Sequence, residues 1–327
     1  MLQLLRSIAV VAALVYSVGT VQACDICGCA GGNSSMGLLP LLQRHFVGAR
    51  WQQQAFATVP HGSGQTSVER FSTIDLWGRW QPHRRIQLIG VLPYASNRRE
   101  YADGSFLSAN GIGDVSLSVH YSLLDPRRQG VRRWAHTLQV GLGVQLPTGN
   151  ASRTDGESQL LHANIQPGTG IAAPFAGVMY ALRHGQWGSS VEATFRKGGE
   201  NDAAYTFGHR LSAQWRIFRK MTTGAVTFLP QTGLMADVRQ KDRDKGSLLA
   251  ESGGKGLFAT AGADMMFRSF MLGVTAQLPV YNHFAKGYVT PRPRLQCTAT
   301  VLIGREKRSV HLQKPPVSPS NSSDEWQ

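Results

Sequence analysis

Apart from its first residues, the sequence lacks any apolar run of the roughly 20 residues that a membrane-spanning helix needs. Charged residues are also scarce, at 17% of the 327 residues, and acidic ones scarcest, with 20 Asp or Glu against 34 Lys or Arg. The missing apolar runs exclude a bundle of membrane-spanning helices. A membrane protein with this composition has to cross the bilayer with strands, which give only half of their positions to lipid.

Cysteine is nearly absent as well. Three of the four cysteines, Cys24, Cys27 and Cys29, lie together in the sequence Cys-Asp-Ile-Cys-Gly-Cys, and Cys297 stands alone. This distribution excludes a fold held together by a framework of disulfides. Cys297 shares one face of a late strand with Leu295, so we expect it to be a small hydrophobic side chain in contact with lipid.

The most informative stretch that is present runs from Asp114 to Leu146. Two segments in it alternate strictly between apolar and polar or tiny residues, which is the period of a β-strand. Their apolar faces are Val115, Leu117, Val119, Tyr121 and Leu123, then Leu138, Val140, Leu142, Val144 and Leu146. These strands approach the roughly 9 to 11 residues of a membrane-spanning strand and exceed the 5 or 6 common in soluble sheets. The pattern predicts an all-β, antiparallel, up-and-down transmembrane β-barrel, with its apolar rows facing lipid and its polar rows facing the lumen.

The same period predicts about twelve strands in the whole chain, an even number as in single-chain outer-membrane barrels. The expected strands are 44–57, 69–81, 85–97, 112–124, 134–147, 165–183, 186–197, 205–218, 221–238, 256–268, 269–281 and 293–304. Tight turns are expected at 82–85, 125–133, 183–186, 219–220 and 268–269. Long loops are expected at 62–67, 98–111, 148–164, 198–204, 239–255 and 282–292, where Gly and Asp are frequent.

Aromatic and basic residues gather beside the tight turns. The aromatic ones, expected to form a girdle at the level of the lipid headgroups, are Trp80, Trp134, Trp187, Trp215, Phe218, Phe267 and Phe270. Much of the net charge of +14 also lies in these turns, which contain a single acidic residue, Asp125. Basic turn tips without a recognition helix or a stacking platform argue against nucleic acid as a partner and favour contact with outer-membrane lipids.

The chain divides into four segments. Residues 1–23 resemble a secretory signal peptide, with an apolar core after Arg6 and a small residue, Ala23, before the expected cleavage point. An N-terminal membrane anchor is the alternative. Residues 24–43 form a Cys-containing N-terminal periplasmic segment, 44–304 the barrel, and 305–327 a disordered polar tail. With short turns on the periplasmic side, both termini are expected in the periplasm of a Gram-negative bacterium, and the barrel in its outer membrane.

Two motifs carry a family resemblance. The sequence Gly111-Ile112-Gly113-Asp114-Val115 opens one strand, and Leu146-Pro147-Thr148-Gly149 closes the next. Together they resemble the outer-membrane β-barrel family named after the meta-pathway of phenol degradation. This resemblance implies a barrel that moves small, often hydrophobic, compounds. The sequence departs from many outer-membrane barrels in lacking an aromatic residue at its end, and from the family pattern in its N-terminal cysteines.

The favoured hypothesis is a channel or transporter for a small-molecule or metal solute. Polar residues of the lumen-facing rows would then set an electrostatic path. The lumen-lining candidates are Asp75, Arg79, Arg85, His120, Gln139, Glu192, Arg196, Arg210 and Asp264. Alternatively, these charges pair across a closed lumen and only stabilise the barrel.

Two other functions stay open from the sequence alone. One is an outer-membrane lipid-modifying enzyme in which His120 activates Ser118 or Ser122 on the same strand face. No Gly-x-Ser-x-Gly elbow supports it, and residues two apart on a strand are not within hydrogen-bonding distance by default. We therefore expect a protein that is not an enzyme. The other is a barrel that serves mainly to anchor a metal-binding segment.

That metal-binding segment would be formed by Cys24, Cys27 and Cys29. Three thiols within six residues, with glycines beside them, can surround one ion, and thiolates prefer Cu(I) or Zn(II) to hard cations. Oxidation of two thiols to a disulfide and lipidation of Cys24 are the alternatives. Nothing in the sequence points to any other cofactor.

We predict that the purified, reduced protein binds about one copper or zinc ion per chain through these thiolates. Metal analysis of the wild type and of a variant with serine at Cys24, Cys27 and Cys29 measures this. Equal metal content in the two proteins would rule the site out.

Overall fold

The computed structural model describes residues 44–59, 66–125, 134–154, 161–250 and 252–304. In them, twelve antiparallel strand positions form a closed barrel in which each position pairs with the next, and the last pairs with the first. The wall consists of β1 (His45–Thr58), β2 (Ser67–His83), β3 (Ile86–Tyr101), β4 (Phe106–Ile112) with β5 (Ser116–Leu124), β6 (Trp134–Gln145), β7 (Ala173–His184), β8 (Trp187–Arg196), β10 (Arg210–Arg219), β12 (Val226–Arg239), β15 (Gly254–Phe267), β16 (Phe270–Phe284), and β17 (Val289–Pro291) with β18 (Arg294–Ile303). This confirms the predicted fold class.

Short elements complete the described chain. A hairpin strand, β11 (Met221–Thr223), pairs with β12, and a single 3-10 turn, η3 (Ala285–Gly287), follows β16. Apart from the wall, β9 (Tyr205–Thr206), β13 (Arg243–Asp244) and β14 (Ser247–Leu248) form a small separate sheet. No helix in the described part of the chain is long and apolar enough to cross a bilayer.

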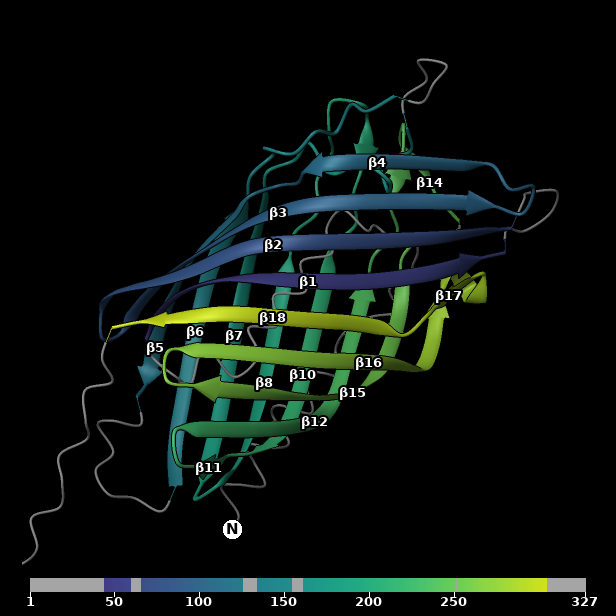
Figure 1. The fold of residues 1–327 in the computed structure, drawn as a ribbon. Helices are drawn as coiled ribbons and strands as arrows, with labels where there is room; N and C mark the ends of the chain where they lie inside the picture. Colours follow the sequence, from purple (N-terminus) through teal and green to yellow (C-terminus); the bar gives the residue numbers. More distant parts are fainter. Residues whose placement is uncertain (1–43, 60–65, 126–133, 155–160, 251, 305–327) are drawn as a thin grey trace, which may run out of the picture.

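The barrel closes between the two ends of the wall. β1 pairs with β18 from His45–Ile303 to Gln53–Leu295, so the first and last residues of the wall lie side by side. In Figure 1 the near strands β1, β2, β3, β15, β16 and β18 cross the far strands, β6 to β8, at a steep angle. Opposite walls cross in this way because every strand is tilted relative to the barrel axis.

Side-chain exposure confirms the assignment of faces in the two alternating segments. On β6, Leu142 is 71% exposed, whereas Gln139 is 3% exposed. On β5, Leu117 and Val119 are likewise exposed, while Ser122 is buried. The apolar rows therefore form the outer surface of the barrel and the polar rows its interior.

Six of the seven expected girdle aromatics lie exposed near the tight turns: Trp80, Trp134, Trp187, Trp215, Phe267 and Phe270. The prediction for Phe218 is wrong, because this residue is 3% exposed. Its ring packs where Gly188 on β8 leaves space, since a Cβ at Gly188 would lie 2.2 Å from the ring. The missing side chain of Gly188 thus lets an aromatic ring turn inward.

Several element boundaries differ from the prediction. The expected loop at 98–111 is mostly strand, because β3 continues to Tyr101 and β4 starts at Phe106. Ion pairs that link Arg70 and Arg98 to Glu100 stabilise this polar extension. The expected strand 165–183 begins only at Ala173, since Pro167 and two glycines interrupt regular pairing before it. β10 likewise begins at Arg210 rather than at 205, since Tyr205 pairs with Asp244 of β13.

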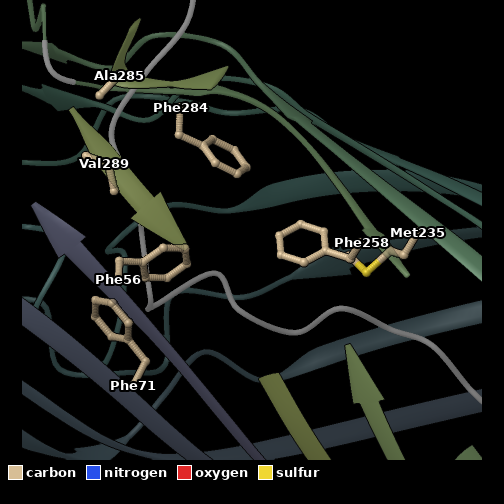
Figure 2. Packing of buried hydrophobic residues seen from close by; sticks show 7 residues of the cluster. All are labelled: Phe56, Phe71, Met235, Phe258, Phe284, Ala285 and Val289. Carbon is tan, nitrogen blue, oxygen red and sulfur yellow. The ribbon is translucent and has the colours of Figure 1, made fainter. Parts of the chain in front are cut away.

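The alternating pattern of the sequence predicted a polar interior. The prediction is wrong in part, because the interior also contains apolar side chains. Figure 2 shows an apolar cluster between strands β1, β2, β12, β15, β16 and β17. We call it the aromatic cluster; its members are Phe56, Phe71, Met235, Phe258, Phe284, Ala285 and Val289. A second inward group contains Phe46 and Trp77, whose ring centroids are 4.6 Å apart. Aromatic side chains therefore fill part of the barrel from inside.

We predict that Val140→Arg lowers the yield of folded barrel, because an arginine facing lipid near the bilayer midplane costs about 2–4 kcal/mol. The measurement is the folded fraction on unheated gels, in which folded barrels migrate differently from boiled ones, combined with urea titration. Val59→Arg is the matched control, because Val59 is also an exposed valine but lies beyond the end of β1. Equal losses from the two substitutions would contradict the assignment of the outer face.

Candidate solute pathway

The inward side chains of β1 and β2 form a paired band of charge. Arg50 and Asp75 are register partners, and Arg50 Nη2 lies 2.7 Å from Asp75 Oδ2, with both side chains 2% exposed. The Gln52 amide donates a second hydrogen bond of 2.7 Å to the same oxygen. The Arg50 guanidinium also lies 5.2 Å from the centroid of Trp77. Asp75 therefore presents a fixed, compensated charge to the interior.

Arg79 fixes the interior close to the tight turns. Its Nε and Nη2 atoms donate to the carbonyl of Arg44 at 3.0 and 2.6 Å, and Nη1 donates to Gln87 at 3.3 Å. The guanidinium lies 4.9 Å from the centroid of Phe46. Arg79 thus joins the start of β1 to the inner faces of β2 and β3.

Acidic side chains on later strands also accept hydrogen bonds from neighbouring strands. Arg216 on β10 donates to Glu192 on β8 at 3.1 Å. Asp264 on β15 accepts a hydrogen bond of 3.1 Å from Gln231 on β12. Each of these carboxylates is bound by a donor from a neighbouring strand, so the charged lining is held at fixed positions around the barrel.

The space enclosed by these charged side chains is small. A cavity of about 50 Å³ lies inside the wall between β1 and β8, bordered by Arg50, Trp77, Gln139, Gly177 and Glu192. A volume of this size holds only a few water molecules. The interior at this level is therefore narrow. Twelve strands enclose more space than eight, but large inward side chains fill most of it.

His120 and Ser118 lie within hydrogen-bonding distance, contrary to the expectation from their spacing. Ser118 Oγ is 3.1 Å from His120 Nε2. The ring of His120 packs over Gly141, where a Cβ would be only 2.5 Å from Nδ1. In the described part of the chain His120 has no carboxylate hydrogen-bonded to its second nitrogen, so the pair lacks the third group that orients a catalytic histidine.

Asp114, in the break between β4 and β5, connects three distant segments. It is 4% exposed, and its carboxylate accepts four hydrogen bonds. The Gln145 amide and the backbone N–H of Thr169 each donate to Oδ2 at 2.8 Å, and the Thr169 hydroxyl donates to it at 2.5 Å. The backbone N–H of Gly149 donates to Oδ1 at 2.9 Å. Asp114 therefore acts as a clamp on the loop between β6 and β7.

This loop, residues 146–154 and 161–172, is called the inward loop below. Its Ile165 is fully buried, and its carbonyls at Ile165 and Gln166 accept hydrogen bonds of 2.9 and 3.3 Å from Asn97 on the inner face of β3. Gln166 in turn holds both the N–H and the carbonyl of Arg153 at 2.9 Å. The loop thus folds back against the wall and occupies part of the mouth of the barrel.

Glycines allow the backbone segments at the clamp to approach closely. A Cβ at Gly149 would lie 2.7 Å from backbone atoms of Gly113 and of Gly168, and one at Gly168 would lie 2.5 Å from the backbone of Gly149. Any side chain at Gly149 or Gly168 would force these segments apart. The glycines of the two sequence motifs therefore serve this contact, in addition to the strand ends inferred from the sequence.

His162 lies on the exposed side of the inward loop. Partial desolvation by the packed loop lowers the pKa of its imidazole to about 4, and the positive charge of Arg99 acts in the same direction. Because solvent reaches the ring and screens these effects, protonation of His162 makes only a small contribution to the stability of the loop.

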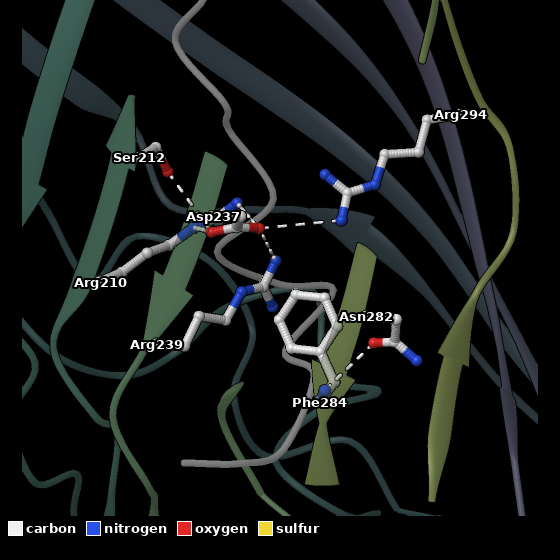
Figure 3. Close-up of polar contacts among 7 residues, drawn as sticks. All are labelled: Arg210, Ser212, Asp237, Arg239, Asn282, Phe284 and Arg294. Carbon is white, nitrogen blue, oxygen red and sulfur yellow. Dashed lines mark hydrogen bonds and ion pairs between the residues drawn. The ribbon is translucent and has the colours of Figure 1, made fainter. Parts of the chain in front are cut away.

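The other predicted residues are placed as follows. Gln139 borders the cavity. Arg196 donates to the side-chain oxygen of Gln145, and Arg210 contacts Asp237 at 3.0 Å (Figure 3). Arg85 differs: it lies in the turn before β3 and donates to the hydroxyl of the outward-facing Tyr121, so it does not line the interior. Cys24, Cys27 and Cys29 lie outside the described residues, while Cys297 pairs with Trp51 on the outer face.

Sequence reasoning missed several interior groups. Arg50, Arg216, Asp237, Arg239 and Arg294 are all buried and inward. Arg50 lies on the same face of β1 as Phe46 and Phe56. Because the inward face was expected to be purely polar, the face with these two aromatic residues was not recognised as the inward one, and Arg50 was missed. Arg239 was assigned to a loop because β12 was expected to end one residue earlier.

Comparison with known proteins agrees with this architecture. The model of the family described as "Putative MetA-pathway of phenol degradation" matches residues 49–280. The chain belongs to this family. No curated protein matches its sequence.

Solved structures resemble this family member in fold. An outer membrane channel from Pseudomonas putida F1 superposes with a TM-score of 0.56 and 12% identity, over 80% of this chain and 96% of the other. Two others superpose less closely. A FadL homologue from Pseudomonas aeruginosa has a TM-score of 0.38 and 10% identity, over 79% and 90% of the chains. The CymD monoaromatic hydrocarbon channel has a TM-score of 0.40 and 8% identity, over 89% and 97%.

We predict that Asp114→Asn releases the inward loop while the barrel stays folded. A carboxamide cannot accept all four hydrogen bonds, and bonds to a charged group contribute about 1.5–3 kcal/mol each. Trypsin should then cut after Arg153, whose backbone Gln166 holds in the wild type. Mass spectrometry of the fragments measures this.

The matched control for the clamp is Asp103→Asn. Asp103 accepts a hydrogen bond of 2.9 Å from the N–H of Ser105 in the exposed turn between β3 and β4. This variant should be cut no faster than the wild type. Continued protection of Arg153 in Asp114→Asn would show that the carboxylate does not hold the loop.

Proposed function

We propose that the protein is an outer-membrane channel that passes small solutes through the interior of its barrel. Its closed wall of twelve strands is wider than the eight-strand barrels that side chains can fill and narrower than porins of about 16 strands. Fold likeness to an outer membrane channel supports this proposal. The membership in a family described by phenol degradation favours small aromatic compounds among the solutes.

The observation that carries the proposal is the fixed charged lining. Charged side chains line the interior, and carboxylates such as Asp75 and Glu192 are each held by an arginine on a neighbouring strand. A lining of this kind offers a small solute polar contacts at fixed positions along the interior. The inward loop narrows the mouth, so only small solutes pass.

The proposed orientation puts the tight turns and both chain ends in the periplasm. The start of β1 and the end of β18 are neighbours at the end of the barrel that carries the tight turns. The longer connections, including the inward loop and the sheet of β9, β13 and β14, then face the outside. A tag inserted at Gly246, between β13 and β14, should be reached by antibody on whole cells.

We predict that the refolded protein gives stepwise currents in planar bilayers and that Gly177→Trp at least halves the step size. Gly177 borders the interior cavity, so an indole there narrows the path. The neighbouring Ala176 is exposed on the outer face, which makes Ala176→Trp the matched control with unchanged currents.

Both variants are first tested for heat-modifiable migration on gels, so that only folded barrels are compared. Silence from the folded wild type would refute the channel and favour a closed barrel in which the charges serve stability alone. Equal currents from Gly177→Trp and the wild type would place the solute path elsewhere.

A further inference from the structure

Two neighbouring glycines leave side chains missing from the outer face of the wall. Gly78 on β2 and Gly90 on β3 are register partners. Both belong to the outward face of their strands, because Arg79 and Ile89 beside them are buried in the interior. The two strands lie side by side on the near wall in Figure 1. The lipid-facing surface is therefore thin where these strands meet.

The missing side chains leave an open hollow of about 790 Å³, a volume within the range of ligand-binding clefts. Its outward-facing borders include Val47 and Leu117, which lie in the row of the two glycines. Trp80, Leu88 and Leu142 border it in the next row toward the tight turns. The hollow therefore has apolar walls on both sides.

The occupant of this hollow comes from the membrane, because the surface around it faces lipid. Leu117 is 49% exposed and Leu142 is 71% exposed, so both project into the bilayer beside the hollow. An unfilled hollow would deprive its walls of the dispersion contacts that close packing provides. A flexible, apolar acyl chain fills such a shape without burying any polar group.

A pair of arginines, Arg84 and Arg85, forms the tight turn between β2 and β3. Arg85 Nη1 donates a hydrogen bond of 3.0 Å to the hydroxyl of Tyr121, which holds the guanidinium on the outer face of the wall. The carbonyl of Arg85 accepts a hydrogen bond of 2.8 Å from the N–H of Ser122. Neither arginine forms an ion pair with a carboxylate of the described residues. Arg85 is thus a fixed positive charge available to an anion in the lipid headgroup layer.

The spacing of the arginine and the hollow matches one lipid molecule. Gly90 follows Arg85 by five positions along the chain. At about 3.3 Å per residue they are about 16 Å apart along the strand, and a strand tilt of about 40° makes this about 12 Å of depth. One leaflet supplies about 15 Å of hydrocarbon, half of the thickness of about 30 Å. An acyl chain whose headgroup contacts Arg85 therefore reaches the hollow.

We propose that the hollow over Gly78 and Gly90 and the guanidinium of Arg85 form a binding site for one anionic phospholipid. An acyl chain fills the hollow, and the phosphate contacts Arg85, since arginine binds phosphate oxygens through a planar pair of donors. The adjacent Arg84 adds positive charge, which favours an anionic headgroup and repels the ammonium of phosphatidylethanolamine. With the tight turns in the periplasm, as proposed above, the lipid belongs to the periplasmic leaflet.

The test is native mass spectrometry of the folded wild-type barrel in detergent that contains equal amounts of phosphatidylglycerol and phosphatidylethanolamine with the same acyl chains. We expect one phosphatidylglycerol per chain, retained at least fivefold more often than phosphatidylethanolamine. Equal retention of the two lipids would overturn the role of the arginines. A folded barrel that retains neither lipid would overturn the site, as would dimers without lipid, because a second copy would then cover the hollow.

Gly90→Leu fills the hollow from within the wall. A Cβ at this position would lie 3.5 Å from Leu117 Cδ2, which is an ordinary contact, so the barrel should still fold. Retention of phosphatidylglycerol should fall at least fivefold. The matched control is Ala176→Leu, an exposed position on β7, which should retain lipid as the wild type does. Equal loss in Ala176→Leu, or no loss in folded Gly90→Leu, would overturn the proposal.

Arg85→Gln is the second variant, and it carries the test if Gly90→Leu fails the gel assay for folding. It should lower the retention of phosphatidylglycerol to that of phosphatidylethanolamine, because the hollow remains and the charge is lost. The matched control is Arg183→Gln, an exposed arginine near the end of β7, which should keep the preference of the wild type. An unchanged preference in Arg85→Gln would overturn the site.

Failure of this site is distinguishable from failure of the channel, because the site lies on the outer surface of the wall. Stepwise currents from a barrel that retains no lipid refute the site alone. Selective retention of phosphatidylglycerol by a silent barrel refutes the channel alone.

Discussion

The structure depends on the requirement that every backbone N–H and C=O in the wall finds a partner within the chain, since hydrocarbon offers none. The pairing of β1 with β18 meets this requirement at the seam, so the sheet has no free edge there. A closed sheet then has just two surfaces. Lipid dictates the outer one, which is apolar wherever β5 and β6 alternate, and only the inner surface is left for chemistry. Charged groups, aromatic rings and the inward loop therefore all lie within one small interior volume.

Most of the wall could be predicted because its determinants are local. The alternation of Val140 with Gln139 fixes faces without any knowledge of neighbours, and the predicted strands coincide with the observed ones within a few residues over most of the ring. Errors arose where polar strands rise above the bilayer level, as at Arg98 to Glu100, since no apolar row marks them. Phe218 was misplaced for a different reason. Its inward turn depends on Gly188 of the neighbouring strand, which the local pattern does not identify as a partner.

The interior site was far less predictable, because its residues meet only through the register of the closed ring. Arg294 and Asp237 are separated by two intervening strands in the wall, and the distance between them depends on barrel tilt and on the bulk of Phe258. Asp114 could be singled out as part of a motif, but its partner Thr169 lies 55 residues later in a segment expected to be strand. Single acidic candidates such as Glu192 were found, whereas the arginines that compensate them were mostly missed.

The position of the Asp114 clamp also has a consequence for biogenesis. Its donors come from the end of β6, from the start of the inward loop and from the residues just before β7, so all three must be in register before the carboxylate is satisfied. The clamp is therefore complete only when β5 pairs with β6 and β6 pairs with β7 in register. The narrowing of the mouth by the inward loop is thereby coupled to correct assembly of this part of the wall.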